Sequence, residues 1–177
     1  MMNSNDIQYI EYGEAISIYN RMIDNSGGGF EGIRDEGGIR AALEFIRNDS
    51  YYPSFTDKLT YLVFRFCSGH FFNDGNKRIA LTLGAYFLHK NSMNWHACVF
   101  MKQLEAIVYH VAASHIDQHL LLRIVQCFIA GNDYDEELKI DIAMAMNNGS
   151  LKLTTDLQVQ PPAVCQPKPQ SPENKTV

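Results

Sequence analysis

Apolar residues recur at helical spacing through most of the 177-residue chain. Between residues 59 and 67 they stand at positions i, i+3, i+4, i+7 and i+8, the one-sided stripe of a helix that faces a core. Residues 79–88 are apolar on nearly every face, a pattern typical of a helix surrounded by protein. We therefore predict two buried helices, with the polar segment 70–78 as the loop that joins them.

Similar stripes predict five further helices, whose ends carry residue types that start or stop helices. We expect them at residues 14–24, 38–47, 100–113, 118–130 and 133–146. Ser54 and Asp57 have the spacing of a capping box before the 59–67 stripe. Asp117 is expected to cap the 118–130 helix and Gly131 to close it. Residues 95–99 are expected as a short extended piece.

The composition changes near residue 150. Five prolines lie between residues 161 and 172 among Gln and Lys, and such a segment cannot bury enough apolar surface to offset the entropy cost of ordering. The length and the 46% hydrophobic content suit one globular domain. We therefore expect one domain over residues 1–149 and a disordered tail over residues 150–177.

The charge of the chain argues against nucleic acid as a partner. The net charge is −5 and the pI is about 5.6, whereas phosphate-backbone binding needs a basic face. No basic start leads into an apolar run, and no run approaches the length of a membrane span. The four cysteines form no CxxC pair, which argues against a zinc or disulfide framework. We expect a cytoplasmic protein with neither nucleic acid nor membrane as a partner.

Two short motifs are better explained by structure than by function. Gly27, Gly29 and Gly32 match GxGxxG, but a predicted helix precedes them where a dinucleotide loop needs a strand, so we interpret them as a flexible connection. His115 and His119 stand at i and i+4, yet no third metal ligand accompanies them. We interpret them as partly exposed histidines at a helix start.

The loop over residues 70–78 carries the chemistry. If a helix begins at Gly75 or Asn76, its first backbone N–H groups have no intrahelical partner and make a site for an anion. Arg78 is badly placed for the helix dipole unless a phosphate lies between it and those groups. Asp74 is a hard oxygen ligand suited to Mg²⁺ beside phosphate. Histidine is the side chain that ordinarily changes charge near neutral pH, so His70 is a candidate base for a hydroxyl.

A simpler interpretation explains each of these residues singly. Asp74 would be an N-cap, His70 an ordinary loop histidine, and Lys77 and Arg78 solvated cations. Their concentration in nine residues between two buried helices favours a functional loop. A Walker A loop is excluded, because Asn76 separates Gly75 from the lysine. Phe72 is expected to anchor the loop to the core.

The sequence His-Phe-Phe-Asn-Asp-Gly-Asn-Lys-Arg resembles the signature loop of Fic/Doc proteins, HPFx[D/E]GNGRxxR. The resemblance extends over about residues 7–130. It implies an all-α fold, a Fic/Doc-like helical bundle with a small flap hairpin. It also implies an enzyme that uses ATP and Mg²⁺ to transfer part of the nucleotide to a protein Ser, Thr or Tyr hydroxyl.

The resemblance assigns roles to matching positions. His70 would be the general base and Asp74 the Mg²⁺ ligand, with Lys77 and Arg78 as further catalytic residues. The nucleotide-binding set would be Asn73, Gly75, Asn76, Lys77 and Arg78. Tyr51 and Tyr52 would lie in the flap, which in this family holds the target by strand addition.

Departures from the pattern bear on the transferred group. Lys77 replaces the second Gly and Leu81 the last Arg, as in the Doc branch (death-on-curing toxins), which phosphorylates elongation factor Tu. Gly75 is instead typical of Fic loops that transfer AMP, because Doc loops tend to carry Ala there. The balance favours a Doc-like toxin kinase over adenylylation. A third hypothesis is a catalytically inactive module that binds nucleotide or a partner.

The family also suggests how the activity is controlled. Many Fic proteins carry an inhibitory motif, [S/T]xxxE[G/N], whose Glu pairs with the last Arg. This chain lacks the motif and has Leu81 at the arginine position. We therefore expect a separate, Phd-like antitoxin whose helix lies in a groove of the domain.

Overall fold

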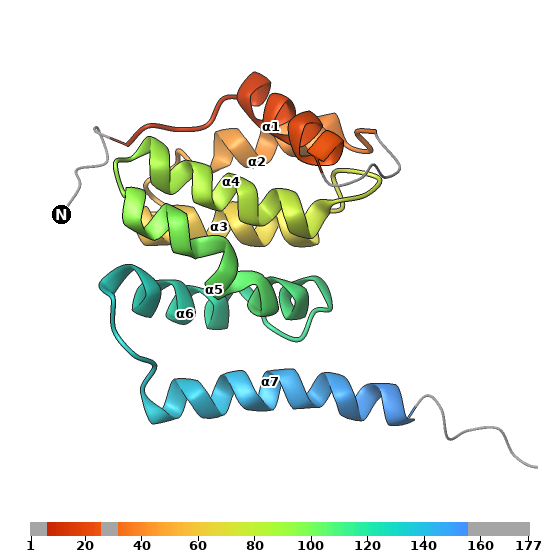
Figure 1. Cartoon of the computed structure of the whole chain (residues 1–177), viewed down its shortest axis with the longest axis vertical. Helices are drawn as coiled ribbons and strands as arrows, with labels where there is room; N and C mark the ends of the chain where they lie inside the picture. The colour runs from red at the N-terminus through yellow and green to blue at the C-terminus, as the bar shows by residue number, and fades with distance from the viewer. Residues whose placement is uncertain (1–6, 26–31, 156–177) are drawn as a thin grey trace, which may run out of the picture.

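The computed structural model describes residues 7–25 and 32–155, and side chains as far as residue 147. These residues form seven α-helices and no β-strand (Figure 1). The helices are α1 (Tyr12–Asn25), α2 (Glu36–Phe45), α3 (Phe55–Ser68), α4 (Asn76–Lys90), α5 (Asn94–Ala112), α6 (Gln118–Ala130) and α7 (Glu136–Thr155). The expected all-α fold class is confirmed.

The helices α3 and α4 lie side by side at the centre of the molecule (Figure 1). The helices α1 and α2 cover one side of this pair, and α5 and α6 cover the other. The last helix, α7, packs on α6 and α5 at the outer edge of the molecule. The loop between α3 and α4 is therefore held by the most enclosed pair of helices in the fold.

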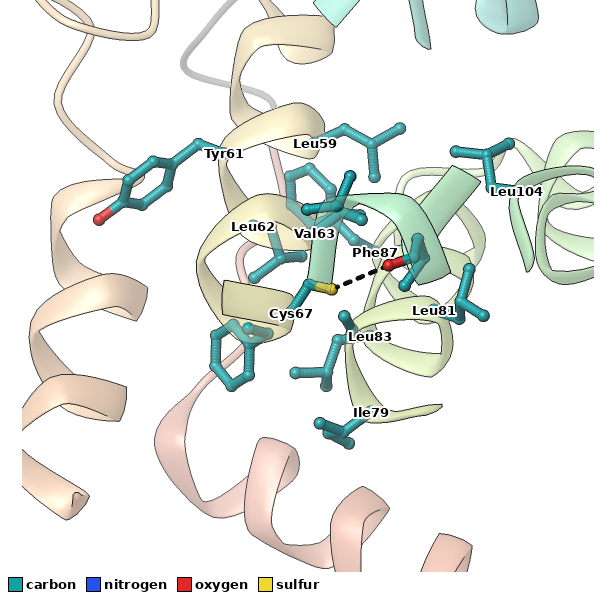
Figure 2. Close-up of a cluster of buried hydrophobic side chains, with 14 of the residues drawn as sticks. Leu59, Tyr61, Leu62, Val63, Cys67, Ile79, Leu81, Leu83, Phe87 and Leu104 are labelled. Carbon is teal, nitrogen blue, oxygen red and sulfur yellow. Dashed lines mark hydrogen bonds between the residues drawn. The ribbon is translucent and has the colours of Figure 1, made fainter. Parts of the chain in front are cut away.

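The core is built on the stripe predicted for α3. All five of its residues are at most 1% exposed: Leu59, Leu62, Val63, Phe66 and Cys67. Figure 2 shows several of them with side chains of α4, including Ile79, Leu83 and Phe87. Burying one large apolar side chain contributes roughly 1.5–3 kcal/mol, so this contact is a main source of stability.

The helix α4 is buried on several faces because α1, α3 and α5 surround it. At Gly84 the packing is close, since a Cβ there would lie 2.5 Å from Cε1 of Phe100 and 3.0 Å from Cγ2 of Val63. The all-round apolar pattern therefore reports packing within a bundle. None of the described helices combines the length and apolar character needed to cross a lipid bilayer.

Helix ends follow the predicted caps. The Ser54 hydroxyl accepts from the Asp57 N–H at 3.1 Å, and the Asp57 carboxylate accepts from the Ser54 N–H at 3.0 Å. Asp117 caps α6 through the N–H of Leu120 at 2.8 Å. Gly131 closes α6 in the left-handed conformation, with φ +66°. The capping box and both ends of α6 are confirmed.

Two helix boundaries differ from the prediction. Residues 95–99 belong to α5 and are not extended, because the N–H of Ala97 already bonds to the carbonyl of Met93 at 2.9 Å. The helix α7 continues through residues 147–149 to Thr155, so the expected domain limit at residue 149 falls inside a helix. Asn and Gly lower helix propensity by at most about 1 kcal/mol each and need not end a helix. Residues 156–177, the rest of the expected tail, lie outside the described residues.

The expected flap hairpin is absent from the described segment between α2 and α3, which forms turns. Lys58 of α3 is fully buried, and its ammonium donates to two groups of this segment, the Ile46 carbonyl at 3.0 Å and Asp49 at 2.7 Å. These bonds hold the segment in a compact form. Pro53 also lacks the N–H that strand pairing would need.

Replacing Gly84 by Ala should lower the free energy of unfolding by about 1–3 kcal/mol, because the new methyl group would overlap the Phe100 ring. Gly13 is the matched control, since it lies at the start of α1 with nothing within 4 Å of the added carbon. Gly13→Ala should raise stability by about 0.5 kcal/mol. Urea unfolding measures both, and a shift in the same direction would contradict the packing at Gly84.

Candidate functional site

The candidate site is the loop that leads from α3 to α4. Gly69 is the C-cap of α3, and His70 follows it in the left-handed conformation, with φ +50°. Gly75 precedes α4 with φ +80°. The predicted loop between two buried helices is confirmed, and α4 begins at Asn76 as expected. The exposed side chain of His70 stands at a position where helices usually place glycine.

Phe71 fixes the first half of the loop. Its ring is 1% exposed and packs edge-on against Phe66 at 5.3 Å between centroids. Its carbonyl accepts from the N–H groups of Arg34 and Asp35 at 2.8 and 3.0 Å. The loop is thus bound to the segment that enters α2, a link that sequence patterns did not indicate.

Phe72 fixes the second half and is the anchor that the sequence predicted. It is 1% exposed and stacks on Tyr19 of α1 at 4.0 Å. Its N–H donates to the Asn76 side chain at 3.1 Å, and its carbonyl accepts from that amide at 2.8 Å. Asn76 therefore closes the loop with its side chain.

The first turn of α4 has the features of an anion site. Gly75 has no side chain, and among the described residues no side chain caps this end of the helix. The N–H groups of a first turn have no intrahelical acceptor and carry the positive end of the helix dipole. Lys77 and Arg78 stand in the same turn. Together these groups favour a phosphate.

Asp74 and Arg78 form an ion pair with each other. The Arg78 guanidinium lies 3.0 Å from Oδ2 of Asp74, and Oδ1 of Asp74 accepts from the Gly75 N–H at 2.6 Å. The two side chains are 50% and 39% exposed. An ion pair at such exposure contributes at most about 1 kcal/mol, so incoming phosphate and metal can replace it at low cost.

A cleft of about 290 Å³ brings the predicted site residues together. Its lining consists of Cys67, His70, Asn73, Asp74, Gly75, Asn76, Lys77, Arg78 and Ala112. Typical ligand pockets run from about 300 to 1,000 Å³, so this cleft suits the phosphate chain better than a whole nucleotide. An oxygen ligand, two cations and the positive end of a helix dipole in one cleft fit Mg²⁺ and a polyphosphate.

Some groups at the cleft come from other helices and were missed by sequence reasoning. The Lys77 ammonium lies 5.1 Å from the ring centroid of Tyr109 on α5, near Ala112 in the cleft wall. The Cys67 thiol donates to the Val108 carbonyl at 3.3 Å (Figure 2). Burial raises the pKa of Cys67 to about 11, so it stays a neutral thiol.

Tyr51 and Tyr52 do not line this cleft, and the target-docking role assigned to them stays a prediction. They precede the first residue of α3, whereas His70 follows its end, and a helix of 14 residues is about 21 Å long. The Tyr52 ring stacks on Tyr61 at 4.4 Å. The segment beside the loop starts at Gly32, whose carbonyl accepts from the Asn73 N–H at 3.0 Å.

Of the two motifs set aside earlier, the histidine pair lies within the described residues. Nδ1 of His115 lies 3.1 Å from Nδ1 of His110. No group of three or more metal-ligating side chains occurs in the described part of the chain. Gly27 and Gly29 lie outside the described residues.

Comparisons with known proteins agree with the geometry. The family model described as Fic/DOC family matches residues 9–88. The chain is 33% identical over 91 residues to Protein kinase doc of Escherichia phage P1, a match covering 49% of this chain and 71% of that protein. No solved structure matches with significance.

The left-handed conformation of His70 should show in stability. His70→Gly is expected to be more stable than His70→Ala by about 1 kcal/mol, because alanine is strained at φ +50° and glycine is not. At His119, in the first turn of α6, the order should be reversed, since glycine is a poor helix former. Thermal unfolding of the four variants tests this, and the same order at both positions would contradict the loop conformation.

Proposed function

This chain belongs to the Fic/Doc family, and from that premise we propose that it is a Doc-like kinase that phosphorylates a hydroxyl group of a target protein. The similarity to a protein kinase of this family supports a Fic-type transferase. The observation that carries the proposal is the cleft, which joins a candidate base, an oxygen ligand and an uncapped helix start. The phosphoryl donor is ATP with Mg²⁺.

The donor is held at the start of α4. The phosphate chain accepts from the first-turn N–H groups, and the Arg78 guanidinium turns from Asp74 to a phosphate oxygen. Asp74 provides the carboxylate for the metal, which neutralises phosphate charge when it is bound. Gly75 turns the chain into α4 with φ +80°, a conformation that glycine adopts without strain.

His70 acts on the acceptor. Its imidazole takes the proton of a target Ser, Thr or Tyr hydroxyl as the hydroxyl oxygen bonds to the γ-phosphorus. The bond from that phosphorus to the β–γ bridging oxygen breaks, and ADP leaves. The exposed position of His70 at the cleft leaves room for a protein substrate.

Two positions favour phosphate transfer over AMP transfer. Leu81 is 7% exposed and part of the core, so the side chain at the position of the family's last arginine cannot reach outer phosphates. Lys77 adds a long side chain to the first turn, where Fic loops have glycine. Gly75 is the observation that favours the alternative, a Fic-type adenylyltransferase.

We place the target-binding edge at residues 32–34 in place of the segment around Tyr51. Ile33 forms an isolated antiparallel bridge with Phe72 and is 39% exposed. A target segment that adds to this edge by backbone pairing would lie beside His70. Elongation factor Tu, in the cytoplasm, is the first target to test, and a Phd-like antitoxin helix the expected inhibitor.

Incubation with elongation factor Tu and ATP labelled at either the α or the γ phosphate tests the transferred group. We expect label only from the γ position. His70→Ala should lower the rate by about 10²–10⁴-fold and leave nucleotide binding intact. Label from the α position would establish adenylylation instead. ATP binding without transfer to this target or to lysate proteins would favour the inactive binding module.

Expression in a bacterial host without an antitoxin should slow growth, because an unopposed kinase would modify its target. His70→Ala should restore growth at equal protein levels, and co-expression of an antitoxin from the same locus should do the same for the wild type. Normal growth with an enzyme that is active in vitro would contradict the toxin role.

A further inference from the structure

The helix α1 packs against the loop between α3 and α4 through Tyr19. This side chain is 2% exposed, and its ring lies nearly parallel to Phe72, at 4.0 Å and 18°. Its hydroxyl donates a long hydrogen bond of 3.3 Å to the backbone carbonyl of Asp74. One residue thus contacts both the anchor of the loop and the peptide that carries the predicted metal ligand.

Neighbouring residues on the same face of α1 meet the next residue of the loop. A Cβ at Gly75 would lie 3.0 Å from Cε of Met22 and 3.2 Å from Cδ1 of Ile23. Tyr19, Met22 and Ile23 stand at i, i+3 and i+4 and so share one face of the helix. The peptide between Asp74 and Gly75 therefore rests on α1.

The N-terminal part of α1 is hydrogen-bonded to the C-terminal part of α4. The Glu14 carboxylate accepts from the Tyr86 hydroxyl at 2.9 Å and from the Lys90 ammonium at 2.6 and 2.7 Å. These contacts lie at the C-terminal end of α4, whereas Tyr19 contacts the loop before its N-terminus. The helix α1 is therefore bonded to α4, the same helix whose start forms the proposed anion site.

We propose that Tyr19 is a positioning residue for the transfer reaction, an assignment that rests on the proposed function. By holding the Asp74 carbonyl, Tyr19 sets the plane of the peptide that joins Asp74 to Gly75. That plane governs the direction of the Asp74 carboxylate and of the first N–H groups of α4. Tyr19 acts through these groups and does not touch the substrate.

Two phenylalanine substitutions separate positioning from general stability. Tyr19→Phe removes the hydroxyl at the loop and keeps the stacked ring. Tyr86→Phe removes a hydroxyl that also bridges α1 and α4, but at the end away from the loop. Tyr19→Leu removes the stack as well and should have the larger effect.

The readouts are the affinity for Mg²⁺–ATP by calorimetry and the Mg²⁺ dependence of transfer. Tyr19→Phe should weaken nucleotide binding and raise the half-maximal Mg²⁺ concentration by roughly two- to tenfold, the range expected for one hydrogen bond. Tyr86→Phe should leave both within about twofold, even if it lowers the melting temperature equally. Equal effects of the two substitutions on Mg²⁺ dependence would overturn the proposal.

Amide hydrogen exchange tests the same inference without any activity. Tyr19→Phe should speed exchange at residues 74–79 several-fold relative to the wild type, and Tyr86→Phe should not. If the wild type neither binds ATP nor transfers label, the proposed function fails, and unchanged exchange in Tyr19→Phe would separately overturn the role of Tyr19.

Discussion

The burial of two consecutive phenylalanines in the connection between α3 and α4 is the constraint on which the site depends. Phe71 packs against Phe66 of α3, and Phe72 stacks on Tyr19 of α1. Because both rings are withdrawn into the core, the polar side chains around them, His70, Asn73 and Asp74, are left at the surface. Apolar packing thus decides which groups of the loop can meet a ligand.

Hydrogen bonds to the backbone of the loop then hold its polar groups in place. The Asn76 amide pairs with both backbone groups of Phe72, and the Phe71 carbonyl accepts two N–H groups from the segment before α2. The left-handed conformation of His70 is tolerated because these neighbours determine it. Such rigidity suits a site whose proposed work is to position phosphates and a hydroxyl.

Two charged side chains of the cleft are paired with each other in a way that is easily broken. Asp74 and Arg78 satisfy each other in a partly exposed pair, while the start of α4 offers its N–H groups without a capping side chain. Because both side chains are partly exposed, breaking this ion pair costs little. The Cys67 thiol in the cleft lining adds no charge, because burial raises its pKa to about 11. The charges that face a ligand therefore come from the loop, the first turn of α4 and its dipole.

The sequence by itself determined the features that depend on near neighbours. Helical periodicity identified the α3 stripe and the enclosed α4, the capping box marked the start of α3, and the loop motif named residues that line one cleft. Tertiary structure decided what depends on distant segments. It placed the Tyr19 hydroxyl against the Asp74 carbonyl, Tyr109 beside Lys77, and Ile33 beside Phe72. Local patterns could not show these contacts, because they join residues on different helices, whose packing is set by the whole core.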